Sequence, residues 1–154
     1  MTSSFDSRDL RMDSAFFDLL TGSYARLVGQ PLVADGKGPP WLYNEAPFVV
    51  LAHNTEPDPH FIYANNAAQV CFDYTWSEFT KLPSRLSAEA PERTERQRLL
   101  DEVRRNGFTR GYRGQRIAKS GRRFWIEDGI VWQLMDANGI VRGQAATFAS
   151  WKDL

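Results

Sequence analysis

The chain has 154 residues, enough for one domain with a substantial core but not for two. Hydrophobic residues make up 42% and charged residues 25%, the balance of an ordinary globular protein. No apolar run approaches the roughly 18–20 residues that span a bilayer, and the N-terminus lacks the basic and apolar regions of a signal peptide. Because Cys71 is the single cysteine, no internal disulfide can form. We therefore expect a cytoplasmic protein with no membrane partner.

The formal net charge is zero but is unevenly spread along the chain. Residues 1–80 carry a net −6, residues 81–125 a net +8 and residues 126–154 a net −2. A basic segment can bind nucleic acid, but no recognition-helix motif or base-stacking platform accompanies this one. We expect its charges to pair with acidic residues of the other segments, and we predict no nucleic-acid partner.

The first predicted element is an amphipathic helix. Residues 1–9 are expected to be frayed, and from Leu10 to Val28 apolar residues recur at helical spacing. The stretch Val33 to Pro40 has the composition of a linker. Residues 10–40 are therefore expected to form an N-terminal helix and linker in front of a main domain, residues 41–154. The apolar positions of the helix are Phe16, Phe17, Leu20, Tyr24, Leu27 and Val28.

The main domain is expected to begin with two short strands, Phe48–His53 and Phe61–Ala64. Asn65 follows them and is a suitable N-cap for a short helix, because its side-chain oxygen can accept the free amide hydrogens. Further helices are predicted at Trp76–Phe79 and, after a proline that suits a first turn, at Pro91–Asn106.

Three strands close the chain, at Tyr112–Lys119, Arg122–Met135 and Ile140–Trp151. The dipeptide Asn138-Gly139 favours a tight hairpin between the last two. This order predicts an α+β fold in which a five-stranded antiparallel sheet cups short helices, with the N-terminal amphipathic helix added to it.

Several segments also carry a family resemblance. They are LTGSYARLVGQPLV (20–33), DPHFIYANNAA (58–68), LPSRLSAE (82–89), ERTERQRLL (92–100), GYRGQRIAKSGRRF (111–124), VWQLMDANG (131–139) and GQAATFASW (143–151). Together they resemble the MEKHLA domain, a PAS-related family found at the end of plant class III homeodomain–leucine zipper proteins and as short bacterial proteins. Without a homeodomain or zipper heptads, the chain resembles the bacterial stand-alone form. The resemblance implies a PAS-like fold and a sensory or regulatory role, and it fixes no ligand.

The cofactors that PAS domains often hold are not expected here. A light-sensing flavin domain carries a cysteine in a motif that corresponds to residues 81–90, and this segment has none; Ala145 stands where such domains carry a glutamine. Haem needs an axial ligand, which in PAS domains is usually a histidine in the helical region. The two histidines here, His53 and His60, instead flank a turn between strands. Two histidines without a cysteine or carboxylate at ligand spacing do not make a zinc site. We therefore predict no cofactor and no metal.

Hydrolytic catalysis is also not indicated. No G-x-S-x-G elbow is present. Glu127 and Asp128 are adjacent, so on a strand they point to opposite faces and cannot act as a pair. We predict that the protein is not an enzyme, although an enzyme of the α+β cone type stays an alternative.

The turn after Ala118 decides which way Arg116 points. A three-residue loop of Lys119, Ser120 and Gly121 places glycine at the left-handed position, whereas Ser is poorly suited to a two-residue turn. We favour the three-residue loop, which turns Arg116 toward the helices.

The same parity defines a candidate ligand pocket between sheet and helices. Its arginine can form an internal ion pair with Asp128, bind backbone carbonyls, or meet a carboxylate of a small ligand; an outward arginine is the remaining alternative. The candidate pocket residues are Tyr63, Tyr112, Arg116, Phe124, Ile126, Asp128, Trp132, Ala145 and Thr147.

The opposite face of the sheet is then expected to carry Trp125, Val131, Ala146 and Phe148. Such a surface needs a cover, and the N-terminal helix can supply it within its own chain or across a homodimer. We expect a sensory domain that binds a small organic ligand, neutral or anionic, and signals through a homodimer. The alternative is a ligand-free interaction module.

Overall fold

The computed structural model describes residues 8–88 and 90–154, without the side chains of residues 90–93. In this part of the chain the elements follow one another as α1 (Ser14–Val28), α2 (Pro39–Asn44), β1 (Val49–His53), β2 (Phe61–Ala64), α3 (Asn66–Phe72), α4 (Trp76–Phe79), the 3₁₀ helix η2 (Ser84–Ser87), α5 (Ala90–Asn106), β3 (Phe108–Ile117), β4 (Arg123–Met135), β5 (Val141–Phe148) and β6 (Ser150–Asp153).

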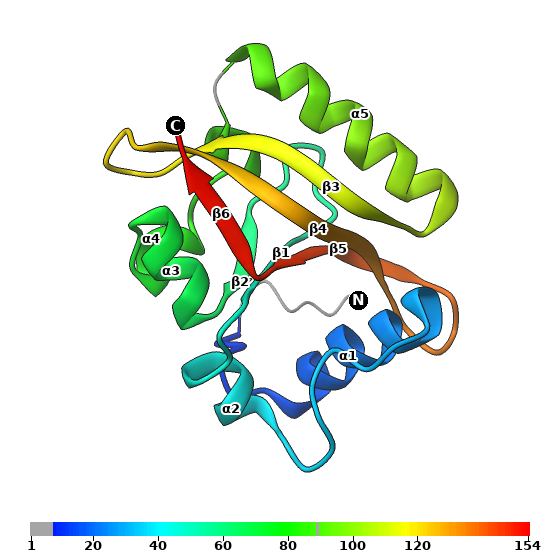
Figure 1. Ribbon diagram of the computed structural model, residues 1–154. Coiled ribbons are helices and arrows are strands. Elements are labelled where there is room, and N and C mark those ends of the chain that lie inside the picture. The colour runs from blue at the N-terminus through cyan, green and yellow to red at the C-terminus, as the bar shows by residue number, and fades with distance from the viewer. Residues whose placement is uncertain (1–7, 89) are drawn as a thin grey trace.

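The strands form one antiparallel sheet in the order β2–β1–β5–β4–β3. β6 follows β5 after a break at Ala149 and pairs with the first part of β4. Helix α1 covers one face of the sheet, while α3, α4 and α5 lie on the other side (Figure 1). The predicted α+β architecture, with a five-stranded antiparallel arrangement and an added N-terminal helix, is confirmed.

The boundaries differ from the predictions in a few places. β3 begins at Phe108, four residues before the predicted start at Tyr112. Helix α2 occupies the end of the predicted linker and continues beyond it, because Pro39 and Pro40 suit the first turn of a helix. Of the N-terminus expected to be frayed, residues 1–7 lie outside the described residues, as does the side chain of Pro91.

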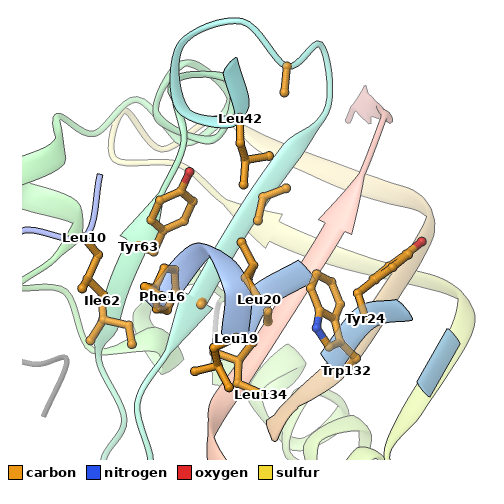
Figure 2. Packing of buried hydrophobic residues seen from close by; sticks show 14 of the residues in the cluster. Leu10, Phe16, Leu19, Leu20, Tyr24, Leu42, Ile62, Tyr63, Trp132 and Leu134 are labelled. Carbon is orange, nitrogen blue, oxygen red and sulfur yellow. The ribbon is translucent and has the colours of Figure 1, made fainter. Parts of the chain in front are cut away.

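Helix α1 is fixed to the sheet of its own chain. Asp13 caps it by accepting a hydrogen bond from the Phe16 amide at 2.8 Å. Its buried face packs on β4, where the Trp132 ring meets the edge of Tyr24 at 4.8 Å between centroids. Figure 2 shows Leu20 beside this pair. The core under α1 also includes Leu10, Leu19, Leu42, Val50, Ile62, Tyr63 and Leu134.

This packing changes the expected dimer surface. The stripe of Phe16, Leu20 and Tyr24 was expected to face Trp125, Val131 and Phe148. Instead the stripe is buried against Trp132 and its neighbours, and Val131 and Phe148 lie in cores on the other side of the sheet. The apolar face of α1 is therefore already covered within one chain.

Asn65 joins three elements at the base of the fold. Its side-chain oxygen accepts from the amides of Val50 at 3.0 Å and Ala68 at 3.1 Å, so it caps α3 as predicted. Its side-chain nitrogen donates to the carbonyls of Leu42 at 3.2 Å and Phe48 at 3.0 Å. All its hydrogen-bonding groups are used, which suits a fully buried amide.

The helices within residues 8–88 and 90–154 include none with the length and apolar character needed to cross a membrane.

Candidate functional site

Two bulges determine which side chains of β3 and β4 point toward α5 and which point toward α1. Asp128 in β4 has a φ of 54° and Gly111 in β3 a φ of 64°. Between the pairings of Gly114 and Tyr112, β4 has one residue more than β3. Between the pairings of Tyr112 and Thr109, β3 has one residue more than β4. Because side chains alternate between faces, each extra residue inverts the strand beyond it.

On the near side of the Asp128 bulge the orientation agrees with the prediction. The amide of Ala118 donates to the Arg122 carbonyl at 2.9 Å, and Gly121 has a φ of 90°, so the turn is the expected three-residue loop. Arg116 lies opposite Phe124 and is buried, with 8% of its surface exposed. It lies on the face of the sheet that α3, α4 and α5 cover, opposite to α1.

Beyond the bulge the predicted facing is wrong. Trp132 and Ala145 belong to the core under α1, and Thr147 shares their face because it pairs with Val50 of that core. Asp128 itself is exposed. The predicted alternation from Ile126 through Trp132 failed because the bulge shifts it by one residue.

Tyr63 is also outside the expected pocket. Its ring packs against Phe16, at 5.3 Å between centroids, and against Tyr43 and Trp76. It contributes to the core under α1.

A cavity of about 60 Å³ lies between the sheet and α5. Of the nine predicted pocket residues, Tyr112 and Arg116 line it, and Ala145 also borders it although it belongs to the core under α1. Phe124 and Ile126 face the same side but pack in the core with α3 and α4. The other lining residues are Leu51, His53, Phe61, Phe72, Ser87, Arg96, Leu99, Leu100, Val131, Gln144 and Ala146.

Two arginines are buried in the wall of this cavity. Arg96 of α5 is 7% exposed, and its guanidinium donates to the Ser84 hydroxyl. Arg116 donates from Nη1 to the Gln115 carbonyl at 2.8 Å and lies over the Tyr112 ring, 5.4 Å from its centroid. Among the described side chains, which leave out those of residues 89–93, neither forms an ion pair with a carboxylate. Of the alternatives for Arg116, the Asp128 ion pair is not among the ion pairs of the described side chains, whereas a bond to a backbone carbonyl is present.

The charge states of Arg96 and Arg116 follow from their burial. Desolvation first, and then repulsion from Arg116, lowers the pKa of Arg96 to about 10. Arg96 therefore stays charged near neutral pH, and the wall holds two positive charges in a place that water reaches poorly.

The exposed cations of the basic segment behave differently. Arg85 pairs with Asp58 at 3.0 Å and Arg122 with Asp153 at 2.7 Å, and Lys119 pairs with Glu78. Part of the basic segment is thus matched by acidic residues from elsewhere in the chain, whereas Arg98 and Arg104 pair with Glu95 and Asp101 of the segment itself. Of the described cations of this segment, Arg96 and Arg116 are the two that are buried, and both line the cavity.

Sequence reasoning missed Arg96, His53 and Gln144. A signal for Arg96 was present, because Arg96, Leu99, Leu100 and Val103 follow the i, i+3, i+4, i+7 spacing of one helix face, and all four are buried. An arginine on an otherwise apolar stripe points into the interior. His53 and Gln144 had no such signal, because their position depends on the pairing of β1 with β5.

The cavity does not fit a flavin or a haem. Its volume of about 60 Å³ is far below the roughly 300–1,000 Å³ typical of pockets for large ligands. Cys71 lies in the core with α3 and α4, where burial raises the pKa of its thiol to about 12. Within the described residues no three His, Cys, Asp or Glu side chains gather as metal ligands.

The sheet order, with helices on one face and α1 on the other, defines a PAS-type domain. The PAS domain of a Colwellia psychrerythraea protein is 15% identical, and the match covers 73% of this chain and 90% of that chain with a TM-score of 0.58. The Erythrobacter litoralis blue-light activated histidine kinase EL346 is 17% identical, over 73% of this chain and 35% of that chain, also with a TM-score of 0.58. The light-state dimer of the fungal blue-light photoreceptor Vivid is 15% identical, over 82% and 90%, with a TM-score of 0.56.

Within this class, the chain belongs to the MEKHLA domain family, whose model matches residues 14–153. No curated protein sequence matches it. The family and fold are consistent with a sensory or regulatory role.

Proposed function

We propose that this chain is a regulatory PAS-type domain that binds a small organic anion in the cavity between the sheet and α5. The observation that carries the proposal is the placement of Arg96 and Arg116 together in the wall of that cavity. An ionised group taken out of water is costly unless it is paired. A carboxylate between the two guanidinium groups supplies that pairing, with charge-assisted hydrogen bonds.

The rest of the cavity supports an organic ligand. Leu99 and Leu100 of α5 face Val131 and Ala146 of the sheet across it. These apolar surfaces suit the carbon skeleton of a short acid.

Thermal unfolding in the presence of sodium propionate tests the proposal, with sodium chloride at equal ionic strength as the reference. A ligand that binds only the folded state raises the melting temperature. We expect propionate to raise it for the wild type and to lose this effect in Arg96→Met and Arg116→Met. Arg113→Met is the matched control, because Arg113 lies on the same strand but is exposed, over Trp125 and paired with Glu127 at 2.9 Å. A shift that persists in Arg116→Met, or no shift with formate, acetate or propionate, contradicts the proposal.

The small volume of the cavity favours one alternative, a ligand-free interaction module. In that case none of these acids shifts the melting temperature. We also propose that the domain is not an enzyme. In support, the Ser87 hydroxyl donates to the Ser84 carbonyl at 2.7 Å, and His53, which lines the same cavity, makes no hydrogen bond to either serine.

Signalling through a homodimer in the cytoplasm completes the proposal. Because α1 is docked on its own sheet, a dimer has to use another surface or exchange α1 between two copies. Light scattering of the full chain, with and without propionate, tests this part: a chain that stays monomeric in both conditions contradicts it.

A further inference from the structure

Two residues that line the same cavity carry buried acceptor atoms with no hydrogen-bond donor among the described residues. The atoms are His53 Nε2 and Gln144 Oε1, and the two residues are 9% and 8% exposed. The two residues lie opposite each other on the paired strands β1 and β5. Both also line an outer groove of about 440 Å³, so they stand between that groove and the inner cavity.

The chemistry of each atom follows from its neighbour. His53 Nδ1 lies 2.8 Å from the Asn54 carbonyl, which can only accept, so Nδ1 carries the hydrogen. Burial lowers the pKa of His53 to about 4, which leaves Nε2 with a free lone pair near neutral pH. The side-chain amide nitrogen of Gln144 donates a hydrogen bond to the Leu100 carbonyl at 3.3 Å. The side-chain oxygen is therefore the atom of Gln144 that can accept a hydrogen bond from a ligand.

The cavity therefore offers two different binding groups to one molecule. Arg96 and Arg116 offer positive charge, whereas His53 and Gln144 offer lone pairs that need a donor. Buried polar groups are nearly always satisfied, so paired acceptors beside a cavity indicate a donor on whatever fills it.

Size limits the ligand further. The cavity of about 60 Å³ is far smaller than a pocket for a drug-sized ligand, so it suits a short acid with few carbon atoms.

We infer that the ligand is a short hydroxy acid, whose carboxylate binds Arg96 and Arg116 and whose hydroxyl donates to His53 or Gln144. This inference rests on the proposed function and specifies its ligand class. A hydroxyl fits better than an ammonium group, because an ammonium adds a third positive charge beside two buried arginines while the carboxylate neutralises only one.

Three acids of equal size test the inference by calorimetric titration of the full chain. Glycolate, propionate and glycine differ only in carrying a hydroxyl, a methyl or an ammonium group next to the CH₂–carboxylate unit. We expect glycolate to bind at least about tenfold more tightly than propionate, because only glycolate satisfies a buried acceptor. Glycine is expected to bind most weakly.

Variants locate the preference. In His53→Phe and Gln144→Met the ratio of glycolate to propionate affinity should fall toward one in at least one case, while propionate still binds. Gln133→Met is the matched control, because Gln133 lines the outer groove but not the inner cavity, and its ratio should stay as in the wild type.

The outcomes separate this inference from the proposed function. Propionate that binds as tightly as glycolate, glycine that binds most tightly, or a ratio unchanged in both His53→Phe and Gln144→Met overturns the hydroxy-acid assignment and leaves the anion site standing. No binding of any of the three acids overturns both.

Discussion

The indole nitrogen of Trp132 donates a hydrogen bond to the hydroxyl of Ser23 at 3.2 Å, between residues that are both fully buried. The same hydroxyl donates to the Leu19 carbonyl at 2.6 Å. This bond joins the middle of α1 to the centre of β4 and fixes how the helix sits on the sheet.

Removing that hydroxyl should weaken the whole domain. In Ser23→Ala the indole N–H is buried without an acceptor, which costs about 1–3 kcal/mol. Urea unfolding should show this loss. Thr21→Ala is the control, because the Thr21 hydroxyl bonds the Phe17 carbonyl of its own helix at 2.8 Å and does not join the helix to the sheet among the described residues. Equal stabilities of the two variants would argue against the role of this bond.

Asn65 should be among the least replaceable polar residues. Asn65→Ala removes the cap of α3 and leaves groups of β1 and α2 without partners, so we expect a loss above about 3 kcal/mol. The exposed neighbour Asn66 supplies the control, since Asn66→Ala should change the free energy of unfolding by less than about 0.5 kcal/mol. A loss below 1 kcal/mol for Asn65→Ala would not agree with its four observed hydrogen bonds.

Arg116 should not be needed for the stability of the ligand-free protein. A buried arginine paired with Asp128 would make Arg116→Met cost about 3–5 kcal/mol, and Asp128→Leu would recover much of that loss. Because Asp128 is exposed, we expect Arg116→Met to cost less than about 1 kcal/mol, or to stabilise, since methionine removes a desolvated charge. A large loss that Asp128→Leu repairs would restore the ion-pair interpretation. Chemical denaturation in an acid-free buffer measures all three variants.

The free energy of unfolding should decrease as the pH is lowered, because of His53. Its pKa is about 4 in the folded protein, mainly through burial, and about 6.5 in an unfolded chain. Below about pH 6.5 the unfolded state takes up a proton that the folded state refuses until about pH 4. Above about pH 6.5 the neutral His53 therefore contributes up to about 3 kcal/mol to the free energy of unfolding. This contribution is lost progressively as the pH falls from about 6.5 to about 4.

Unfolding free energies measured from pH 7 to pH 4 test this dependence. His53→Phe should flatten the slope, while the substitution of the other histidine, His60→Phe, should leave most of it. Parallel curves for the wild type and His53→Phe would show that His53 is not held neutral by its site.

The sequence predicted features that depend on nearby residues. The cap at Asn65, the amphipathic helix that became α1 and the glycine turn at Gly121 each follow from local chemistry, and the turn was enough to orient Arg116. The order of the elements followed from the same local patterns, and the MEKHLA resemblance added the PAS-like fold.

Features set by pairing between distant strands were not predictable in the same way. The bulge at Asp128 has no local signal, because a left-handed aspartate in the middle of a strand is stabilised by its surroundings. That single residue exchanged the faces of Trp132 and Val131, and with them the faces of their β5 partners Ala145 and Ala146. Arg96 was readable from the spacing of α5, whereas the His53–Gln144 pair required the register of β1 on β5.

A crystal structure of the full chain grown with saturating glycolate tests whether the cavity is an anion site. We expect density for one small acid in the cavity, with carboxylate oxygens about 2.7–2.9 Å from guanidinium nitrogens of Arg96 and Arg116. A cavity that holds only water or rearranged side chains under those conditions, with both arginines bonded solely to the protein, would contradict it.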